Sequence, residues 1–132
     1  MRFPAELASV SGARRFVRSC LVAWGHEAET DTAVLLTSEV VTNAIVHGPQ
    51  LADAEVNLQL RLTTHRVRIE VFDGGVVLPA VAGVDADELS GRGLFMVDTM
   101  ASHWGVTPNP FGKSVWFEVD TAVEPYLVLP AA

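Results

Sequence analysis

The apolar residues between Thr32 and His47 follow the spacing of one face of a helix. They recur at intervals of three, four and seven residues, so they can form a single buried stripe. The members of this stripe are Val34, Leu35, Val41, Ala44 and Ile45. Asp31 or Thr32 provides an N-cap, and Gly48 followed by Pro49 provides a stop signal. The pattern therefore predicts a helix over residues 32–47.

A second amphipathic helix is predicted from about Ser9 to Trp24, and Gly25 ends it. Its apolar face consists of Val10, Ala13, Val17, Leu21 and Trp24. Its polar face carries Arg14, Arg15 and Arg18, which are either solvated or form a surface for a partner. Met1 to Ala8 are expected to be a short extended lead-in, and residues 26–31 an acidic connector between the two helices.

Strict alternation of apolar and polar residues predicts two strands, Glu55 to Thr63 and Arg66 to Asp73. A turn at Thr64 and His65 would join them into an antiparallel hairpin. Two further strands are predicted at 102–107 and 113–119, with a turn over 108–112 between them. A helix is expected over 94–100, a loop or lid over Val76 to Ser90, and a tail over 121–132 that covers a sheet edge.

Composition limits the classes of protein that this chain can be. Its 132 residues, 49% of them hydrophobic, fit one domain that spans residues 1–132. The single cysteine, Cys20, cannot form an internal disulfide, and no apolar run is long enough to span a bilayer or begins like a signal peptide. We therefore expect a cytoplasmic protein without a membrane partner. A net charge of −7 argues against nucleic-acid binding.

Glu39 and Asn43 are the first candidates for chemistry. They are four residues apart on the predicted helix, so they share one face, about 40° apart around the axis and about 6 Å apart along it. Asparagine costs roughly half a kcal/mol relative to alanine inside a helix, so another role should favour it there. A carboxylate and an amide oxygen could hold a hydrated Mg²⁺ and orient a nucleophile. The alternative is that both side chains face solvent.

Asp73 is the second candidate. Counting by twos places it on the same face as Val67, Ile69 and Val71, so its carboxylate should point toward the covered side of the sheet. A buried carboxylate needs hydrogen-bond donors, and the exocyclic amine of a purine would be one. Gly74 and Gly75 follow and would let a flat ligand approach the backbone closely. An ordinary Asp-Gly turn is the alternative.

Two glycine-rich stretches are candidate phosphate sites. Gly91-Arg92-Gly93-Leu94 opens a predicted helix, and backbone N–H groups exposed at a helix N-terminus bind anions, although such turns also serve packing alone. Gly112-Lys113-Ser114 is not a P-loop, because Thr107 stands where the first glycine is required and a strand follows. Gly91-x-Gly93 is not a dinucleotide fingerprint either, since Met96 replaces the third glycine.

Three elements remain in a fixed order along the chain. They are the helix with Glu39-x-x-x-Asn43-Ala44, the strand that ends in Asp73-x-Gly75, and Gly91-x-Gly93 at a helix start. Together they resemble the N, G1 and G2 boxes of the GHKL (histidine-kinase-like) ATPase superfamily. Within it, the chain is most similar to stand-alone anti-sigma-factor serine/threonine kinases of the short actinobacterial type. The resemblance implies a two-layer α/β sandwich with helices on one face of a mixed, mostly antiparallel sheet.

The resemblance also implies roles for individual residues in binding ATP and Mg²⁺. Asn43 would bind Mg²⁺ and phosphate, Asp73 the adenine amine, and Gly75 the adenine edge. The turn formed by Gly91, Arg92, Gly93 and Leu94 would bind the phosphates. Glu39 would be the catalytic base or would orient the attacking hydroxyl.

The chain departs from the family pattern at two positions. Val77 replaces a glycine, and Lys113 replaces the threonine that many relatives carry after the glycine of the last strand. By strand parity Lys113 can enter the cleft and contribute positive charge beside Arg92, or its stem can pass the cleft with the ammonium outside. Ser114 offers a hydroxyl, although its parity directs it to the other face.

The leading hypothesis is a protein serine/threonine kinase that binds a sigma factor or its antagonist and phosphorylates the antagonist. The alternative is a regulatory module that binds ATP or a partner without chemistry. The catalytic half of a histidine kinase is disfavoured, because no phospho-acceptor helix pair precedes the domain in this sequence. A homodimer remains an open alternative for the assembly.

Overall fold

The computed structural model describes residues 1–48, 51–73, 96–109 and 112–121. Its helices are α1 (Ser9–Ala23) and α2 (Thr30–His47), with a short 3₁₀ helix η1 (Glu27–Glu29) between them. Its strands are β1 (Arg2–Pro4), β2 (Glu55–Leu62), β3 (Arg66–Asp73), β4 (His103–Asn109) and β5 (Gly112–Asp120). Residues 96–100 are also helical.

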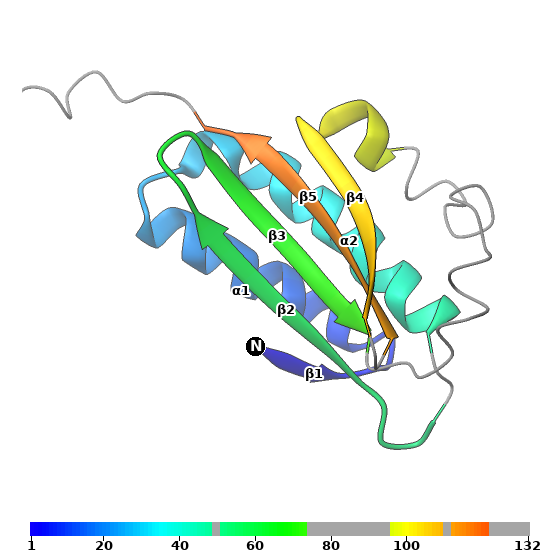
Figure 1. The fold of residues 1–132 in the computed structure, drawn as a ribbon. Coiled ribbons are helices and arrows are strands. Elements are labelled where there is room, and N and C mark those ends of the chain that lie inside the picture. Colours follow the sequence, from blue (N-terminus) through cyan, green and yellow to red (C-terminus); the bar gives the residue numbers. More distant parts are fainter. Residues whose placement is uncertain (49–50, 74–95, 110–111, 122–132) are drawn as a thin grey trace, which may run out of the picture.

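The strands form one sheet in the order β1-β2-β3-β5-β4, and every pairing among the described strands is antiparallel. Both long helices cover the same face of this sheet (Figure 1). The predicted two-layer α/β sandwich is therefore confirmed. The hairpin of β2 and β3 is also as predicted, with Leu62 opposite Val67 and Val56 opposite Asp73.

The core lies between the helices and the sheet. Alternate residues of β3 are buried toward the helices, which is the pattern expected of a sheet covered on one face. The largest fully buried side chains include Phe117, Leu21, Leu36, Leu58 and Ile69. Val97 is also fully buried, and the indole Nε1 of Trp104 donates to Asp98 Oδ1 at 2.8 Å, so the segment 96–100 is fixed against β4.

The start of α2 differs from the prediction. The helix begins at Thr30, and neither Asp31 nor Thr32 is its N-cap. The reason is that η1 runs directly into the helix, while the Thr30 hydroxyl donates to the His26 carbonyl at 3.2 Å. Leu35 is 37% exposed and does not belong to the buried stripe, because Leu36 takes the inward position.

Trp24 was expected on the apolar face of α1, but it is 39% exposed. It stands at the C-cap of that helix, so it lies beyond the last turn that packs on the core. The predicted lead-in proved to be more than a connection, because Arg2–Pro4 pair with β2 as an edge strand. The backbone N–H of Ala5 donates to the Ala54 carbonyl at 2.8 Å and extends this contact.

The turn predicted over 108–112 is also shorter than expected. Pro108 lies inside β4, where it pairs with Lys113, and β5 already begins at Gly112. Proline is tolerated there because β4 is an edge strand. The outer side of an edge strand has no partner strand, so its N–H groups are not all needed for the sheet. The predicted lid at 76–90 and the tail at 122–132 lie outside the described residues.

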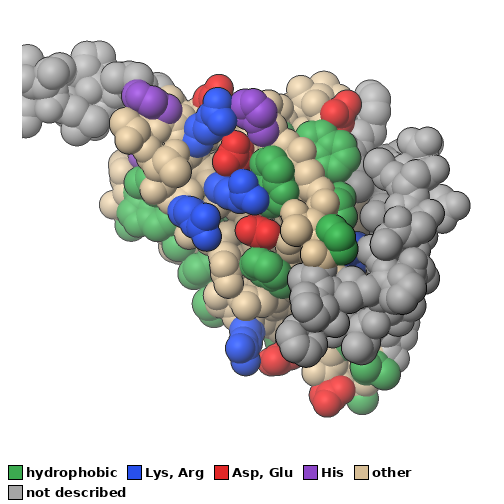
Figure 2. Space-filling view, viewed as in Figure 1, with side chains coloured by type: hydrophobic (Ala, Val, Ile, Leu, Met, Phe, Trp, Pro, Cys, Tyr) green, Lys and Arg blue, Asp and Glu red, His purple; other side chains and the backbone are tan. Residues whose placement is uncertain are grey.

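The sheet face opposite the helices carries interleaved basic and acidic side chains (Figure 2). Arg66 reaches Glu118 at 3.3 Å and Asp120 at 3.0 Å. Arg68 lies 4.0 Å from the centre of the Trp116 ring, in cation–π geometry.

Within the described part of the chain, no helix is both long and apolar enough to cross a bilayer.

Cys20 is expected to react slowly with alkylating reagents. Burial raises the pKa of its thiol, while the positive charge of the chain's N-terminus acts in the opposite direction. The thiolate is the reactive form, so less of it is present at pH 8 than for an exposed cysteine. Iodoacetamide labelling of the folded protein should therefore be slower than labelling in urea. Equal rates would contradict the partial burial of this thiol.

Candidate functional site

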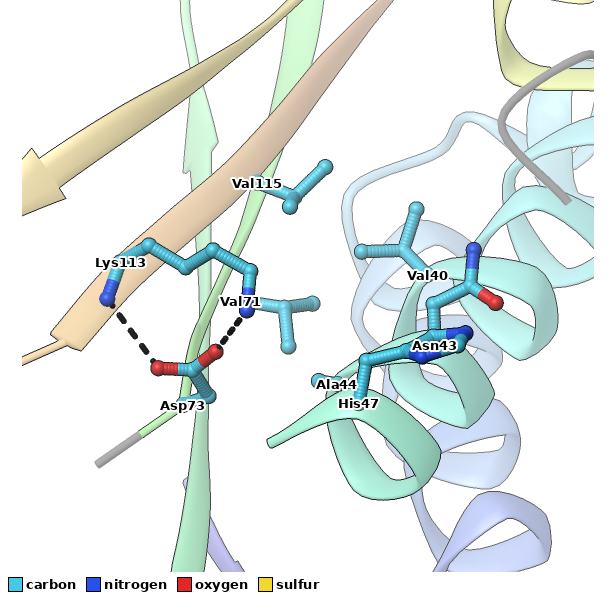
Figure 3. A pocket seen from close by; sticks show the side chains of 8 residues that line it. All are labelled: Val40, Asn43, Ala44, His47, Val71, Asp73, Lys113 and Val115. Carbon is cyan, nitrogen blue, oxygen red and sulfur yellow. Dashed lines mark hydrogen bonds and ion pairs between the residues drawn. The ribbon is translucent and has the colours of Figure 1, made fainter. Parts of the chain in front are cut away.

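A pocket of about 340 Å³ lies between the last turns of α2 and the ends of β3 and β5. Apolar walls from both layers face each other across it, and a few polar groups converge on it (Figure 3). The lining residues are Val40, Asn43, Ala44, His47, Val71, Asp73, Lys113 and Val115.

Asp73 lies where strand parity predicted it, on the helix-facing side of β3. It is only 5% exposed. Its Oδ1 accepts the backbone N–H of Lys113 at 3.1 Å, and its Oδ2 forms an ion pair with the Lys113 ammonium (Figure 3). The sheet register explains this contact, because Phe72 pairs with Ser114 and the next positions along the two strands are Asp73 and Lys113.

Lys113 is itself 5% exposed, so both charges are buried together. Each would be costly alone, and their pairing offsets the loss of water. Of the two possibilities left open by the sequence, the structure shows the first: the lysine side chain enters the pocket. The carboxylate that was expected to read an adenine amine therefore has a cationic neighbour.

Asn43 projects from α2 into the same pocket. Its Nδ2 is shielded from solvent, and it has no hydrogen-bond partner among the described residues. A buried amide donor without an acceptor costs about 1–3 kcal/mol. A ligand oxygen would satisfy this group, so the surroundings of Asn43 favour a polar ligand such as a phosphate.

The other predicted site residues either do not line this pocket or lie outside the described residues. Glu39 lies one helical turn before Asn43, is half-buried and does not line the pocket. Ser114 faces the opposite side of the sheet, where its hydroxyl donates to Glu70 Oε2 at 2.7 Å. The parity of β5 thus directs the Ser114 hydroxyl away from this pocket, which the sequence pattern had also indicated. Gly75, Gly91, Arg92, Gly93 and Leu94 lie outside the described residues.

His47 also lines the pocket, although no role was predicted for it. The sequence could have placed His47 beside Asn43, because His47 is four residues after Asn43 and residues four apart share a helix face. The apolar walls could also have been anticipated, since Val71 and Val115 alternate with polar neighbours and pair across β3 and β5.

Gly48 allows α2 to end close against β3. A Cβ at this position would lie 2.2 Å from the Ala44 carbonyl oxygen and 3.6 Å from Asp73 Cβ. We expect Gly48→Ala to lower the free energy of unfolding by about 1–3 kcal/mol, because the helix end must shift to make room. Urea denaturation measures this loss. A variant as stable as the parent would show that the helix end is not tightly fixed.

Comparison with known proteins identifies the family. A profile described as "Histidine kinase-like ATPase domain" matches residues 3–119. The chain belongs to this family. Membership supports an ATP-binding, kinase-like function and confirms the resemblance to the GHKL superfamily. The narrower resemblance, to anti-sigma-factor kinases, remains a prediction.

Solved structures agree on the fold of this histidine kinase-like ATPase domain. One is the Erythrobacter litoralis EL346 blue-light activated histidine kinase, with 25% identity, a TM-score of 0.51 and coverage of 70% of this chain and 31% of that one. Another is the histidine kinase domain of the same protein, with 19% identity, a TM-score of 0.54 and coverage of 90% and 62%. The chain thus spans less than two thirds of either structure. No curated protein matches it.

The pocket residues fit the adenine and phosphate groups that the family implies. Asp73 offers a buried acceptor for an amine, and Asn43 offers a donor for an oxygen, since its Nδ2 has no partner in the described part of the chain. Within the described residues no group of three His, Cys, Asp or Glu side chains could hold a metal ion. Mg²⁺ takes one or two protein oxygens and completes its shell with water and phosphate, and the Asn43 side chain in the pocket offers one such oxygen.

Proposed function

We propose that this chain binds ATP in the pocket between α2 and β3 and transfers its γ-phosphoryl group to a serine or threonine of a protein partner. The observation that carries the proposal is the placement of Asp73. Its buried carboxylate, at the end of a central strand, lines the same pocket as Asn43, whose shielded Nδ2 has no hydrogen-bond partner among the described residues. Family membership supports the assignment of ATP as the ligand.

Asp73, Asn43 and Glu39 have separate roles in this proposal. The Asp73 carboxylate accepts the exocyclic amine of the base, and the apolar walls hold the faces of the ring. Asn43 contacts phosphate and Mg²⁺, and the metal supplies charge neutralisation when it is bound. Glu39 lies one turn earlier on α2, outside the pocket lining, where it can orient a hydroxyl that arrives from a partner.

The transfer forms a bond from the partner's hydroxyl oxygen to the γ-phosphorus and breaks the bond from that phosphorus to the oxygen of ADP. The hydroxyl proton passes to Glu39. Little covalent chemistry is required of the protein, so positioning and electrostatics do most of the work.

The proposed partner is a sigma factor or its antagonist, and the antagonist is the substrate. The three arginines of α1 are exposed and offer positive charge on a protein whose net charge is −7; they are Arg14, Arg15 and Arg18. Arg18 lies 3.7 Å from Asp31, and an exposed pair of this kind is weak enough to be exchanged for a partner's carboxylate.

A second candidate function is a regulatory module that binds nucleotide without transferring phosphate. The placement of Glu39 favours it, because this side chain does not line the pocket. The two functions share the pocket and differ only in the chemistry at Glu39.

One experiment separates these functions. The purified protein is titrated with ATP, with and without Mg²⁺, and the same preparation is incubated with γ-labelled ATP and candidate antagonist proteins from the same genome. The kinase proposal predicts Mg²⁺-dependent binding and label on a serine or threonine of one candidate. Binding without label on any candidate would favour the regulatory module, and no binding would contradict both.

A further inference from the structure

Lys113 is the single lysine among the 132 residues of this sequence, and it is buried in the pocket rather than placed on the surface. We infer that Lys113 is a specificity-determining residue that reads the base. Its ammonium donates to a ring nitrogen that lies beside the amino group bound by Asp73. This inference rests on the proposed function, because it assigns a further contact to the same nucleotide.

The first step of the argument is the number of donors. An ammonium has three N–H donors and no acceptor. Among the described residues, the Asp73 carboxylate is the one acceptor that the Lys113 ammonium contacts. The side chain is only about one twentieth exposed, so water has little access to it. Buried donors need acceptors, and a ligand in the pocket can supply one.

The second step is the pattern that the pair presents. Lys113 offers a donor, and directly beside it Asp73 offers an acceptor (Figure 3). The matching ligand edge has an amino group next to a ring nitrogen without hydrogen. Adenine carries this edge in its 6-amino group and N1. Guanine reverses the order, because its carbonyl O6 stands next to a protonated N1, so the amino position would set an oxygen against the carboxylate.

The third step concerns competition for the carboxylate. A carboxylate has two oxygens and about four lone-pair sites, so it can accept from the ammonium and from a base amine together. Asp73 Oδ1 already accepts the Lys113 backbone N–H, which keeps the carboxylate in a fixed orientation. The opposite possibility is that the ammonium displaces the base amine. Removing the lysine would then strengthen binding, whereas our inference requires that removal weakens it.

The direct test uses the unmodified protein and three nucleotides. Calorimetry compares ADP with 1-deaza-ADP, which replaces N1 by C–H, and with 7-deaza-ADP as a matched control that leaves the amino and N1 edge intact. A hydrogen bond from a charged donor predicts that 1-deaza-ADP binds roughly ten- to a hundred-fold more weakly than ADP. The affinity of 7-deaza-ADP should stay within a few-fold of that of ADP.

Two variants test whether the discrimination between these nucleotides depends on Lys113. Lys113→Met keeps the length of the side chain and removes its donors, and Arg61→Met, exposed on β2, removes the same charge away from the pocket. Lys113→Met should lose the discrimination between ADP and 1-deaza-ADP, and Arg61→Met should keep it. Urea denaturation confirms that each variant is folded. The comparison in the unmodified protein remains decisive if Lys113→Met does not fold.

The single lysine also provides a spectroscopic readout. Protein labelled with ¹³C at the lysine ε-carbon contains one such side chain, so its signal reports on Lys113 alone. ADP should shift this signal more than 1-deaza-ADP does at saturation. Equal affinity for the two nucleotides, or tighter binding by Lys113→Met, would overturn the role of Lys113. Failure to bind any of the three nucleotides would instead overturn the proposed function.

Discussion

Asp73→Asn is expected to lower the free energy of unfolding by about 3–5 kcal/mol, because it leaves the Lys113 ammonium buried without its countercharge. Both side chains are only 5% exposed, so solvent can do little to compensate. The same order of loss is expected for Lys113→Met, which leaves the carboxylate as the unpaired charge. Urea denaturation followed by circular dichroism measures both.

The double variant Asp73→Asn with Lys113→Met should recover most of this stability, since it removes both charges together. Asp120→Asn is the matched control, because its ion pair with Arg66 is on the surface and its side chain is 63% exposed. An exposed pair contributes about 0–1 kcal/mol. If Asp73→Asn were as mild as this control, the buried ion pair would not be a feature of the folded protein in solution.

Glu39→Gln is expected to reduce phosphoryl transfer to the protein substrate by on the order of 10²–10⁴-fold while ATP binding is kept. The reason is that Asn43 and Asp73, which line the pocket, are unchanged, whereas the group that accepts the hydroxyl proton is lost. Transfer of label from ATP and a binding titration are measured on the same preparation.

Asp120→Asn controls for loss of one negative charge, since its side chain is 63% exposed and it lies at the opposite end of β5 from Lys113. It should transfer phosphate at the parent's rate. A Glu39→Gln variant as active as an active parent would remove Glu39 from the mechanism. A parent that binds ATP and labels no substrate would leave the regulatory module as the function.

The sequence predicted the side of the sheet on which Asp73 lies but not its partner. Parity is a local property, so alternation along β3 was enough to bury the carboxylate. The partner depends on the register of β3 against β5, which joins residues forty positions apart. Parity directed Lys113 toward the cleft as well, but only the three-dimensional structure brings the ammonium to Asp73.

The errors in the predicted elements have similar causes. Pro108 favours a turn by its local chemistry, yet it lies in β4 because an edge strand does not need its N–H. Arg2–Pro4 are too short to show alternation, and they form a strand because β2 offers them an edge. Both outcomes depend on neighbours in the sheet that no local pattern contains.

The central claim is that the pocket beside Asp73 binds ATP, and a calorimetric titration of the parent beside the stability-matched double variant Asp73→Asn with Lys113→Met tests it most directly. The account predicts that the parent binds one ATP per chain in the presence of Mg²⁺. The folded double variant should bind it at least roughly ten-fold more weakly, because the acceptor-only carboxylate becomes an uncharged amide that can turn a donor toward the base amine, and the ammonium beside it is gone. Equal ATP affinity in the two proteins would contradict the assignment of this pocket.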